Sequence, residues 1–370
     1  MTCRSIKTIA VAFAALFAFG VGSGPAAAEE AKVLNVYNWA DYLPDGLLEN
    51  FTKETGIKVR YDTFDTNEIV HAKLIAGRTG YDIVVPSANW AALHIQAGLF
   101  QKLDKSKLPN LKNTDPVMMK LLSLADPGNQ HLVNWAWGFV TLGINTGKVK
   151  AALGSEPMPA NAWSLIFDPK YASKLKSCGI SMLDSATDVI PAALHYLGKP
   201  AYSTNQADYA EATKLMRTIR PNIKIFSSGI NDLASGGLCM ALGYSGDMNI
   251  AAKRAKEGKT GQNIETLVPS TGGLLFYDNM AIPADAEHPN NAHIFINYIL
   301  RPEVAASISN KMSYATMNAA ATALVDKEIT ANSSIFLSDD TKKKMVAQGV
   351  TTNDMRRVMT RSFTTFKTGL

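Results

Sequence analysis

Acidic and aromatic side chains gather where several predicted strands of this chain end. Each group follows or lies in an apolar run typical of a buried strand, at residues 33–39, 179–183, 238–244 and 274–283. In open parallel sheets, ligands bind beyond the carboxyl ends of the strands. The candidate residues at these positions are Trp39, Asp41, Tyr42, Asp184, Asp188, Tyr244, Asp247, Phe276 and Asp278.

Carboxylates beside aromatic rings suit a ligand that carries ammonium groups at both ends of a methylene chain. Four buried methylenes contribute roughly 3 kcal/mol, and each cation over an aromatic face adds about 0.5 to 2 kcal/mol. Micromolar binding needs about 8 kcal/mol. Because the rings alone fall short of that value, the carboxylates must supply the remaining affinity and select cations over sugars and anions.

Each candidate also has an ordinary structural interpretation. Asp41, Asp184 and Asp188 are residue types that cap helices, and Tyr244 and Phe276 taken singly are more often core residues. A further polar segment lacks the spacing and the central glycine of an EF-hand. We interpret its residues as surface and capping groups, namely Asp62, Asp65, Asn67 and Glu68.

Motifs for catalysis are weak in this sequence. The segment GYSGD (residues 243–247) is nearest to a nucleophile elbow but lacks the final glycine in register. The chain has no phosphate loop, no H-E-x-x-H and no G-x-G-x-x-G. We therefore expect no catalytic residue, no metal and no cofactor. A secreted hydrolase that uses a pair of carboxylates stays open as the competing class.

The N-terminus has the pattern of a cleavable signal peptide. Arg4 and Lys7 precede an apolar stretch at residues 9–21, and residues 26–28 form an A-x-A cleavage site. The apolar stretch is shorter than the ~20 residues of a membrane-spanning helix, and a retained anchor is the alternative. Cleavage after Ala28 leaves 342 residues (370 less 28), about two domains by the usual size.

Two cysteines remain after this cleavage, because Cys3 lies in the part removed. In an oxidising compartment, Cys178 and Cys239 are expected to form one disulfide. Loss of the two basic residues near the N-terminus lowers the formal charge from +5 to +3, a balance too mild to indicate nucleic acid. The densest basic run, residues 342–344, is interpreted as a solvated helix face.

Strands alternate with helices along most of the chain, which predicts an α/β fold with parallel sheets. The predicted strands are residues 33–39, 57–64, 81–86, 139–144, 179–183, 238–244 and 274–283. The predicted helices are residues 44–55, 67–76, 188–197, 207–219 and 291–300, with one more after Pro302. No long linker separates two independent domains, so we expect two lobes that share crossing strands.

Eight segments together resemble the periplasmic spermidine/putrescine-binding proteins of ABC transporters, and the likeness is greatest to the putrescine-binding branch. It extends over essentially the whole mature chain. The segments are VYNWADY (36–42), FTKETGIKV (51–59), DIVVPS (82–87), KLKSCG (174–179), INDL (230–233), AIPADA (281–286), YILRP (298–302) and AAT (320–322).

The resemblance implies a type II periplasmic binding protein fold, in which two lobes with parallel-dominated sheets are joined by crossing hinge segments and close on the ligand. The N-terminal lobe is expected at residues 29–136 and 265–308, and the C-terminal lobe at residues 137–264 and 309–370. The resemblance further implies a periplasmic monomer that binds no nucleic acid. Its function would be to deliver a polyamine, putrescine first, to the permease subunits of an inner-membrane importer.

The resemblance also implies a set of ligand-binding residues. Asp41 would pair with one ammonium group, Ser87 would contribute a hydroxyl, and Asp247 and Asp278 would form the anionic pair at the other end. The full set is Trp39, Asp41, Tyr42, Ser87, Asp188, Tyr244, Asp247, Phe276, Asp278 and Tyr314.

Several positions bear on which amine is bound. Ala40 stands where the family usually has a hydroxyl residue, Tyr244 where it has tryptophan, and Asp188 where the putrescine branch has glutamate. These smaller residues enlarge the site slightly and leave cadaverine, agmatine and spermidine as alternatives. Asp247 replaces an uncharged hydroxyl residue of the spermidine branch, and Phe276 a larger tryptophan, which favours a diamine.

Overall fold

The computed structural model describes residues 1–2, 30–40, 42–64 and 66–369. The chain divides into the units Met1–Ala31 and Lys32–Leu370, and every described helix and strand belongs to the second unit. The predicted signal peptide lies almost entirely outside the described residues. Among the described helices, none combines the length and the apolar character needed to cross a membrane.

The first sheet has the strand order β2-β1-β3, and both of its strand pairs are parallel. Its strands are β1 (Val33–Trp39), β2 (Lys58–Phe64) and β3 (Ile83–Val84), and the helices that follow them are α1 (Leu47–Thr55), α2 (Asn67–Ala76) and α3 (Ala88–Gln96). This order confirms the predicted alternation of strands and helices in the first part of the chain.

The second sheet has the strand order β6-β5-β7-β4-β8, and β9 also pairs with β4. Its strands are β4 (Val133–Asn145), β5 (Ile180–Met182), β6 (Ile223–Phe226), β7 (Met240–Tyr244), β8 (Ile264–Thr266) and β9 (Leu274–Met280). The pairs β5–β6 and β5–β7 are parallel, as predicted. β4 is antiparallel to all three of its neighbours, which the alternation of strands and helices did not indicate.

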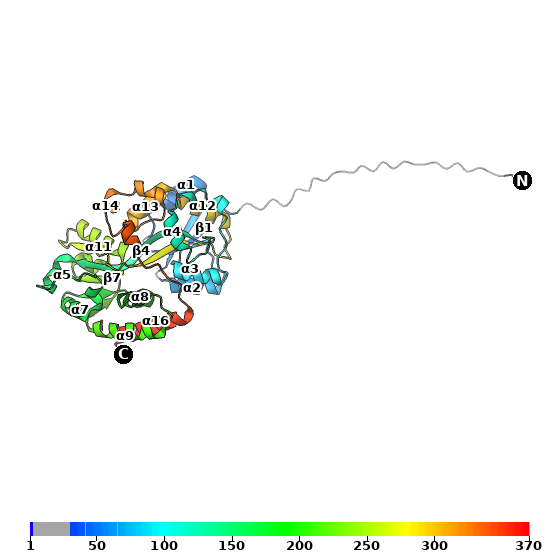
Figure 1. Cartoon of the computed structure of the whole chain (residues 1–370). Coiled ribbons are helices and arrows are strands. Elements are labelled where there is room, and N and C mark those ends of the chain that lie inside the picture. The colour runs from blue at the N-terminus through cyan, green and yellow to red at the C-terminus, as the bar shows by residue number, and fades with distance from the viewer. Residues whose placement is uncertain (3–29, 41, 65, 370) are drawn as a thin grey trace. The chain divides into compact units, whose positions relative to one another are not determined.

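Two long buried strands connect the two sheets. Every residue of β4 is buried; its first half pairs with β9 and its second half with β7 and β8. The end of β9 then approaches the segment after β3, because Asp278 bridges to Ser87 and Ala281 to Val84. β4 and β9 are therefore the crossing strands that the sequence predicted, and Figure 1 labels β4 between β7 and β1.

The remaining helices cover the two sheets. α16, the last of them, packs against α8 and α9 beside the second sheet (Figure 1). Their bounds are α4 (Pro116–Leu122), α5 (Thr146–Leu153), α6 (Ser164–Phe167), α7 (Pro169–Leu175), α8 (Ala186–Tyr196), α9 (Gln206–Ile219), α10 (Ile230–Ser235), α11 (Ser245–Glu257), α12 (Pro289–Ile299), α13 (Pro302–Met312), α14 (Lys327–Thr330), α15 (Asp339–Lys342) and α16 (Asn353–Thr368).

The structure shifts the ends of several predicted elements, among them α1 and β4. α1 begins at Leu47 rather than at residue 44, because Gly46 has a left-handed backbone conformation that a helix interior does not allow. β4 begins at Val133 rather than at residue 139, because pairing with β9 extends it toward the N-terminus. The local sequence pattern could not reveal this extension, because the pairing strand β9 lies more than a hundred residues away in sequence.

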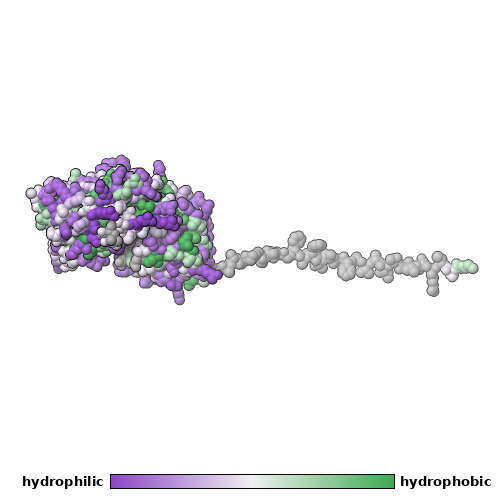
Figure 2. Space-filling model, turned by 90° about the horizontal axis from the view of Figure 1, so that it is seen from below, coloured by the Kyte–Doolittle hydropathy of each residue, from purple (hydrophilic) through white to green (hydrophobic). Residues whose placement is uncertain are grey.

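The surface carries its apolar residues in small groups. On the face shown in Figure 2, hydrophobic residues are scattered among a majority of hydrophilic ones. The large hydrophobic side chains that the described residues do expose include Ile69, Val117 and Ile294, which come from three different helices. Single exposed apolar residues of this kind are ordinary on soluble proteins and do not define an interface.

Cys178 and Cys239 form the predicted disulfide, with their Cα atoms 5.4 Å apart and 61 positions apart in sequence. Closing a loop of this length stabilises a fold by about 4 kcal/mol in the chain-entropy model. We expect the double variant Cys178→Ala/Cys239→Ala to lose that amount of unfolding free energy in urea titration. Wild type unfolded under reducing conditions is the control and should match the variant. An unchanged urea midpoint in the variant would contradict the prediction.

Candidate functional site

Three buried or half-buried aspartates each accept a hydrogen bond from the hydroxyl of a tyrosine. The pairs and their oxygen–oxygen distances are Tyr42–Asp278 at 2.8 Å, Tyr244–Asp188 at 2.8 Å and Tyr314–Asp247 at 3.1 Å. Burial, followed by the charge of the aspartates, raises the pKa of all three tyrosines well above its usual value. The hydroxyls therefore keep their protons at neutral pH and remain donors to the carboxylates.

Asp278 is the most buried of these carboxylates, with 2% of its surface exposed. Burial raises its pKa to about 7, and the charge of Asp188 adds to that effect. Hydrogen bonds from Ser87 Oγ at 2.6 Å and from Tyr42 oppose the shift, since they stabilise the charged form. Such a carboxyl group is close to its protonation midpoint near neutral pH and would become fully charged beside a cation.

Asp188 lies in the first turn of α8, where the partial positive charge of the helix end favours a carboxylate. Its Oδ2 also accepts a hydrogen bond from Ser185 Oγ at 2.6 Å. Burial is the main cause that raises its pKa, despite the hydrogen bonds from Ser185 and Tyr244. The residue before the helix is Ser185, so Asp188 is not the N-cap that the structural interpretation considered.

No cationic side chain among the described residues forms an ion pair with Asp188 or Asp278. The ion pairs between described residues involve neither of them. An uncompensated buried carboxylate is costly. Both carboxylates therefore sit where a bound cation would relieve the cost of their burial.

Five aromatic rings form a continuous row beside these carboxylates. In order along the row they are Trp39, Tyr42, Tyr314, Phe276 and Tyr244, and successive ring centroids are 6.3, 6.2, 5.8 and 5.2 Å apart. The row begins at the end of β1 and reaches the end of β7. The row therefore provides a continuous aromatic surface from Tyr42, which bonds to Asp278, to Tyr244, which bonds to Asp188.

The site residues come from ends of elements in both sheets, as expected for a ligand site in an open α/β protein. Ser87 is the N-cap of α3, and Tyr244 is both the last residue of β7 and the N-cap of α11. Phe276 and Asp278 lie in the crossing strand β9. Tyr314 follows α13, after Ser313 ends that helix in a left-handed conformation.

Two glycines give the ring of Tyr314 its place. A Cβ atom on Gly246 would lie 2.2 to 2.5 Å from the ring, and one on Gly138 would lie 2.8 Å from it. Neither glycine has a positive φ, so the close approach, and not the backbone conformation, is what excludes a side chain. The sequence segment GYSGD thus serves to admit a tyrosine and not to expose a nucleophile.

The structure brings together nine of the ten predicted ligand-binding residues, and Asp41 lies outside the described residues. Asp184, the additional strand-end candidate, is elsewhere and pairs with Lys367. The expected pairing of Asp247 with Asp278 stays a prediction; both of their charges raise the pKa of Tyr314, which lies near each of them.

Sequence analysis missed residues that hold the site in place. Asn67 was interpreted as a surface or capping group, but its amide nitrogen donates to Ser87 Oγ at 3.1 Å, and its Oδ1 accepts from the Ser87 backbone N–H at 3.0 Å. Tyr202 is a second missed residue, whose pKa is raised by burial and by the charge of Asp188. Only the position of Asn67 at the start of a helix gave a signal, and it suggested a different role.

The raised pKa of Asp278 predicts a pH-dependent stability. Because the folded state holds this proton more tightly than the unfolded state, the unfolding free energy of wild type should fall as pH rises from about 4 to about 7, by up to about 4 kcal/mol. The variant Asp278→Asn lacks this contribution, so its stability relative to wild type should increase over that range. Urea unfolding of the ligand-free proteins measures the difference, with the exposed Asp184→Asn as control. Parallel pH profiles for Asp278→Asn and wild type would contradict the prediction.

Comparison with known proteins places this geometry in a family. The family model for bacterial extracellular solute-binding proteins matches residues 46–336. The putrescine-binding periplasmic protein SpuD of Pseudomonas aeruginosa is 45% identical over 96% of this chain and 97% of its own length. The putrescine-binding periplasmic protein PotF of Escherichia coli is 46% identical over 96% of each chain.

A solved structure agrees with these relatives. A putative spermidine/putrescine ABC transporter protein from Listeria monocytogenes superimposes with a TM-score of 0.79 at 33% identity, over 91% of this chain and 99% of that one. The type II periplasmic binding fold is thereby confirmed, and the alternative of a secreted hydrolase is set aside because the family consists of non-enzymatic transport components. The chain belongs to the bacterial extracellular solute-binding proteins.

Proposed function

We propose that this protein is the periplasmic solute-binding component of an ABC importer and that it binds a polyamine, putrescine first. The observation that carries the proposal is the set of three aspartate–tyrosine pairs along a row of aromatic rings. The relatives named for putrescine binding support the same assignment.

A diamine matches this arrangement group by group. Its ammonium ends would donate hydrogen bonds to the carboxylates, and its methylene chain would lie along the rings. Charge-assisted hydrogen bonds of this kind are about twice as strong as neutral ones. An ammonium group beside Asp278 would lower the pKa of that carboxyl group below 7, so binding in mildly acidic solution would release a proton. Asp41 belongs to the proposed site on the strength of its motif.

The proposed cycle needs two lobes and an export step. The lobes would comprise residues 29–136 with 265–308 and residues 137–264 with 309–370, and would close about the crossing strands β4 and β9. Cleavage of the signal peptide after Ala28 would release a monomer into the periplasm. The loaded protein would then deliver its ligand to the permease subunits in the inner membrane and would bind no nucleic acid.

The identity of the amine rests on the charge of the site. Asp247 would hold one terminal ammonium group at the far end of the pocket and close that end to a third amine-bearing arm, and leaving this carboxylate unmatched would cost more than a small void. This favours a diamine that uses both ends. Other relatives are named for putrescine with agmatine, cadaverine or spermidine, and those amines are the alternatives.

Ligand screening tests the proposed function. Thermal shift against polyamines, sugars, amino acids and ferric citrate should give a large upward shift with polyamines alone, because a ligand at a hundred times its Kd stabilises a protein by about 2.7 kcal/mol. In competition calorimetry on refolded, ligand-free protein, putrescine should bind at least tenfold more tightly than spermidine, about 1.4 kcal/mol. Equal or tighter spermidine binding would reject the diamine, and a shift with sugars only would reject the polyamine class.

Removal of one charge tests the site itself. Asp278→Asn should weaken putrescine binding by more than about 2 kcal/mol, because it removes one charged partner from a desolvated ammonium group. The matched control is Asp184→Asn, which removes an exposed aspartate outside the cluster and should leave the affinity unchanged. Isothermal calorimetry on both variants gives the comparison, and wild-type affinity in Asp278→Asn would exclude Asp278 from the site.

A further inference from the structure

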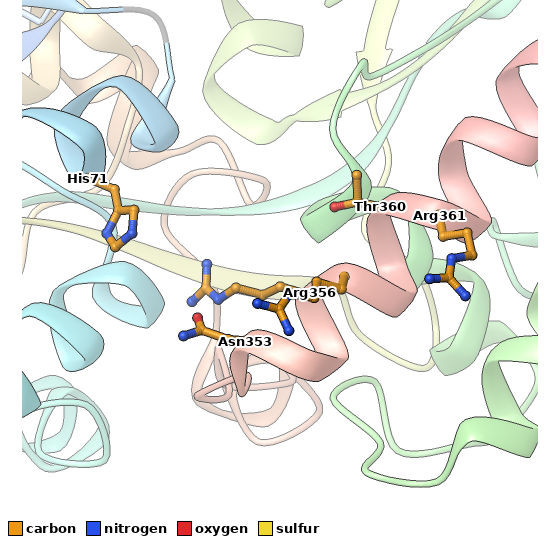
Figure 3. Close-up of a pocket in the computed structure, with 6 residues that line it drawn as sticks. His71, Asn353, Arg356, Thr360 and Arg361 are labelled. Carbon is orange, nitrogen blue, oxygen red and sulfur yellow. The ribbon is translucent and has the colours of Figure 1, made fainter. Parts of the chain in front are cut away.

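Arg356 of the last helix, α16, contacts α3, the helix whose N-cap is the candidate site residue Ser87. Arg356 lies in the first turn of α16, and only 9% of its surface is exposed. Its Nη2 donates a hydrogen bond to the backbone oxygen of Asn89 at 3.1 Å, and its guanidinium carbon lies 4.0 Å from the ring centroid of Trp90. In Figure 3, Arg356 extends from α16 toward His71 of α2, next to α3.

The contacted residues form the first turn of α3. Ser87, whose hydroxyl bonds to Asp278, is the N-cap of this helix, and Asn89 and Trp90 follow it by two and three positions. The N–H of Asn89 is in turn directed at Gln348 Oε1 at 3.4 Å, from the segment that leads into α16. Residues 348–356 therefore hold the helix turn that carries one hydrogen-bond donor of the site.

Further along the same buried face, α16 packs on α8, the helix that carries Asp188. Met359, Phe363 and Phe366 of α16 are buried in the same apolar cluster as Val189 and Ile190, which follow Asp188 directly. Contacts thus run from Ser87 through α3, Arg356 and α16 to α8 and Asp188. This route joins Asp278, which bonds to Ser87, to Asp188 through α3, α16 and α8.

The Arg356 contact is one of modest net strength. Burial lowers the pKa of its guanidinium group to about 10, and Nη1 has no hydrogen-bond partner among the described residues. Burying an arginine with an unsatisfied donor costs free energy that the Trp90 and Asn89 contacts partly offset.

We propose that Arg356 is a positioning residue that retains the bound amine by clamping α3 against α16 after the ligand has entered. This inference rests on the proposed function, because the clamp joins the two parts of the chain that would close on a polyamine. Since α3 belongs to one proposed lobe and α16 to the other, the contact would form when the lobes close on the ligand, and its loss should accelerate dissociation and leave association nearly unchanged. A residue needed only for folding would instead lower the stability of the ligand-free protein.

Dissociation kinetics separate these roles. In stopped-flow measurements, Arg356→Ala should release putrescine at least tenfold faster than wild type, with an association rate within twofold of wild type and the same urea midpoint without ligand. Arg356→Lys should show most of the same effect, because an ammonium group lacks the planar fork that stacks on Trp90 and reaches Asn89. Arg357→Ala is the control, since Arg357 is exposed on the same helix and its one ion pair among the described residues is with Asp354.

Two results would overturn the clamp. One is a wild-type dissociation rate in Arg356→Ala, and the other is an equal loss of stability with and without putrescine, which would mark a structural role. Where the alanine variant does not fold, Arg356→Lys and Gln348→Ala supply the same comparison. A wild type that binds no polyamine would reject the proposed function and the clamp together, and this outcome is distinct from a wild type that binds while its variants dissociate normally.

Discussion

The cost of burying carboxylates without a cation is the constraint on which the rest of this structure depends. Asp278 and Asp188 are withdrawn from water and have no basic partner among the described residues, so their charge is stabilised by tyrosine and serine hydroxyls and, for Asp188, by the start of α8. Hydroxyl donors offset only part of that cost. The rest of the fold must therefore be stable enough to tolerate two buried carboxylates that have no cationic partner among the described residues.

The crossing strands supply that stability and also set the position of the site. β4 is buried along its whole length, and β9 pairs with it while carrying both Phe276 and Asp278. A carboxylate on such a strand can be held beside residues of either sheet, which is how Asp278 meets Ser87 and Tyr42 from the N-terminal part of the chain. β9 is thus part of the scaffold and also carries two of the candidate site residues.

Strand ends and family motifs were sufficient to predict the α/β class, the crossing strands and a site set of which nine members prove to be neighbours. Those predictions worked because alternation of strands and helices is local, and because the motifs lie at the ends of strands. The antiparallel pairing of β4, the bond from Asn67 to Ser87 and the reach of Arg356 to α3 escaped prediction. Each of these depends on a partner distant in sequence, and no local periodicity encodes that distance.

The two glycines beside Tyr314 have a consequence for redesign of the protein as a biosensor. Because Gly138 and Gly246 leave no room beyond the ring, the width of the site at this point is set by one replaceable side chain against a bare backbone. Shortening Tyr314 would open space on that backbone for a bulkier guest molecule, while enlarging either glycine would displace the ring. The width of the proposed site could thus be changed at Tyr314 alone, with loss of the hydrogen bond that Tyr314 donates to Asp247.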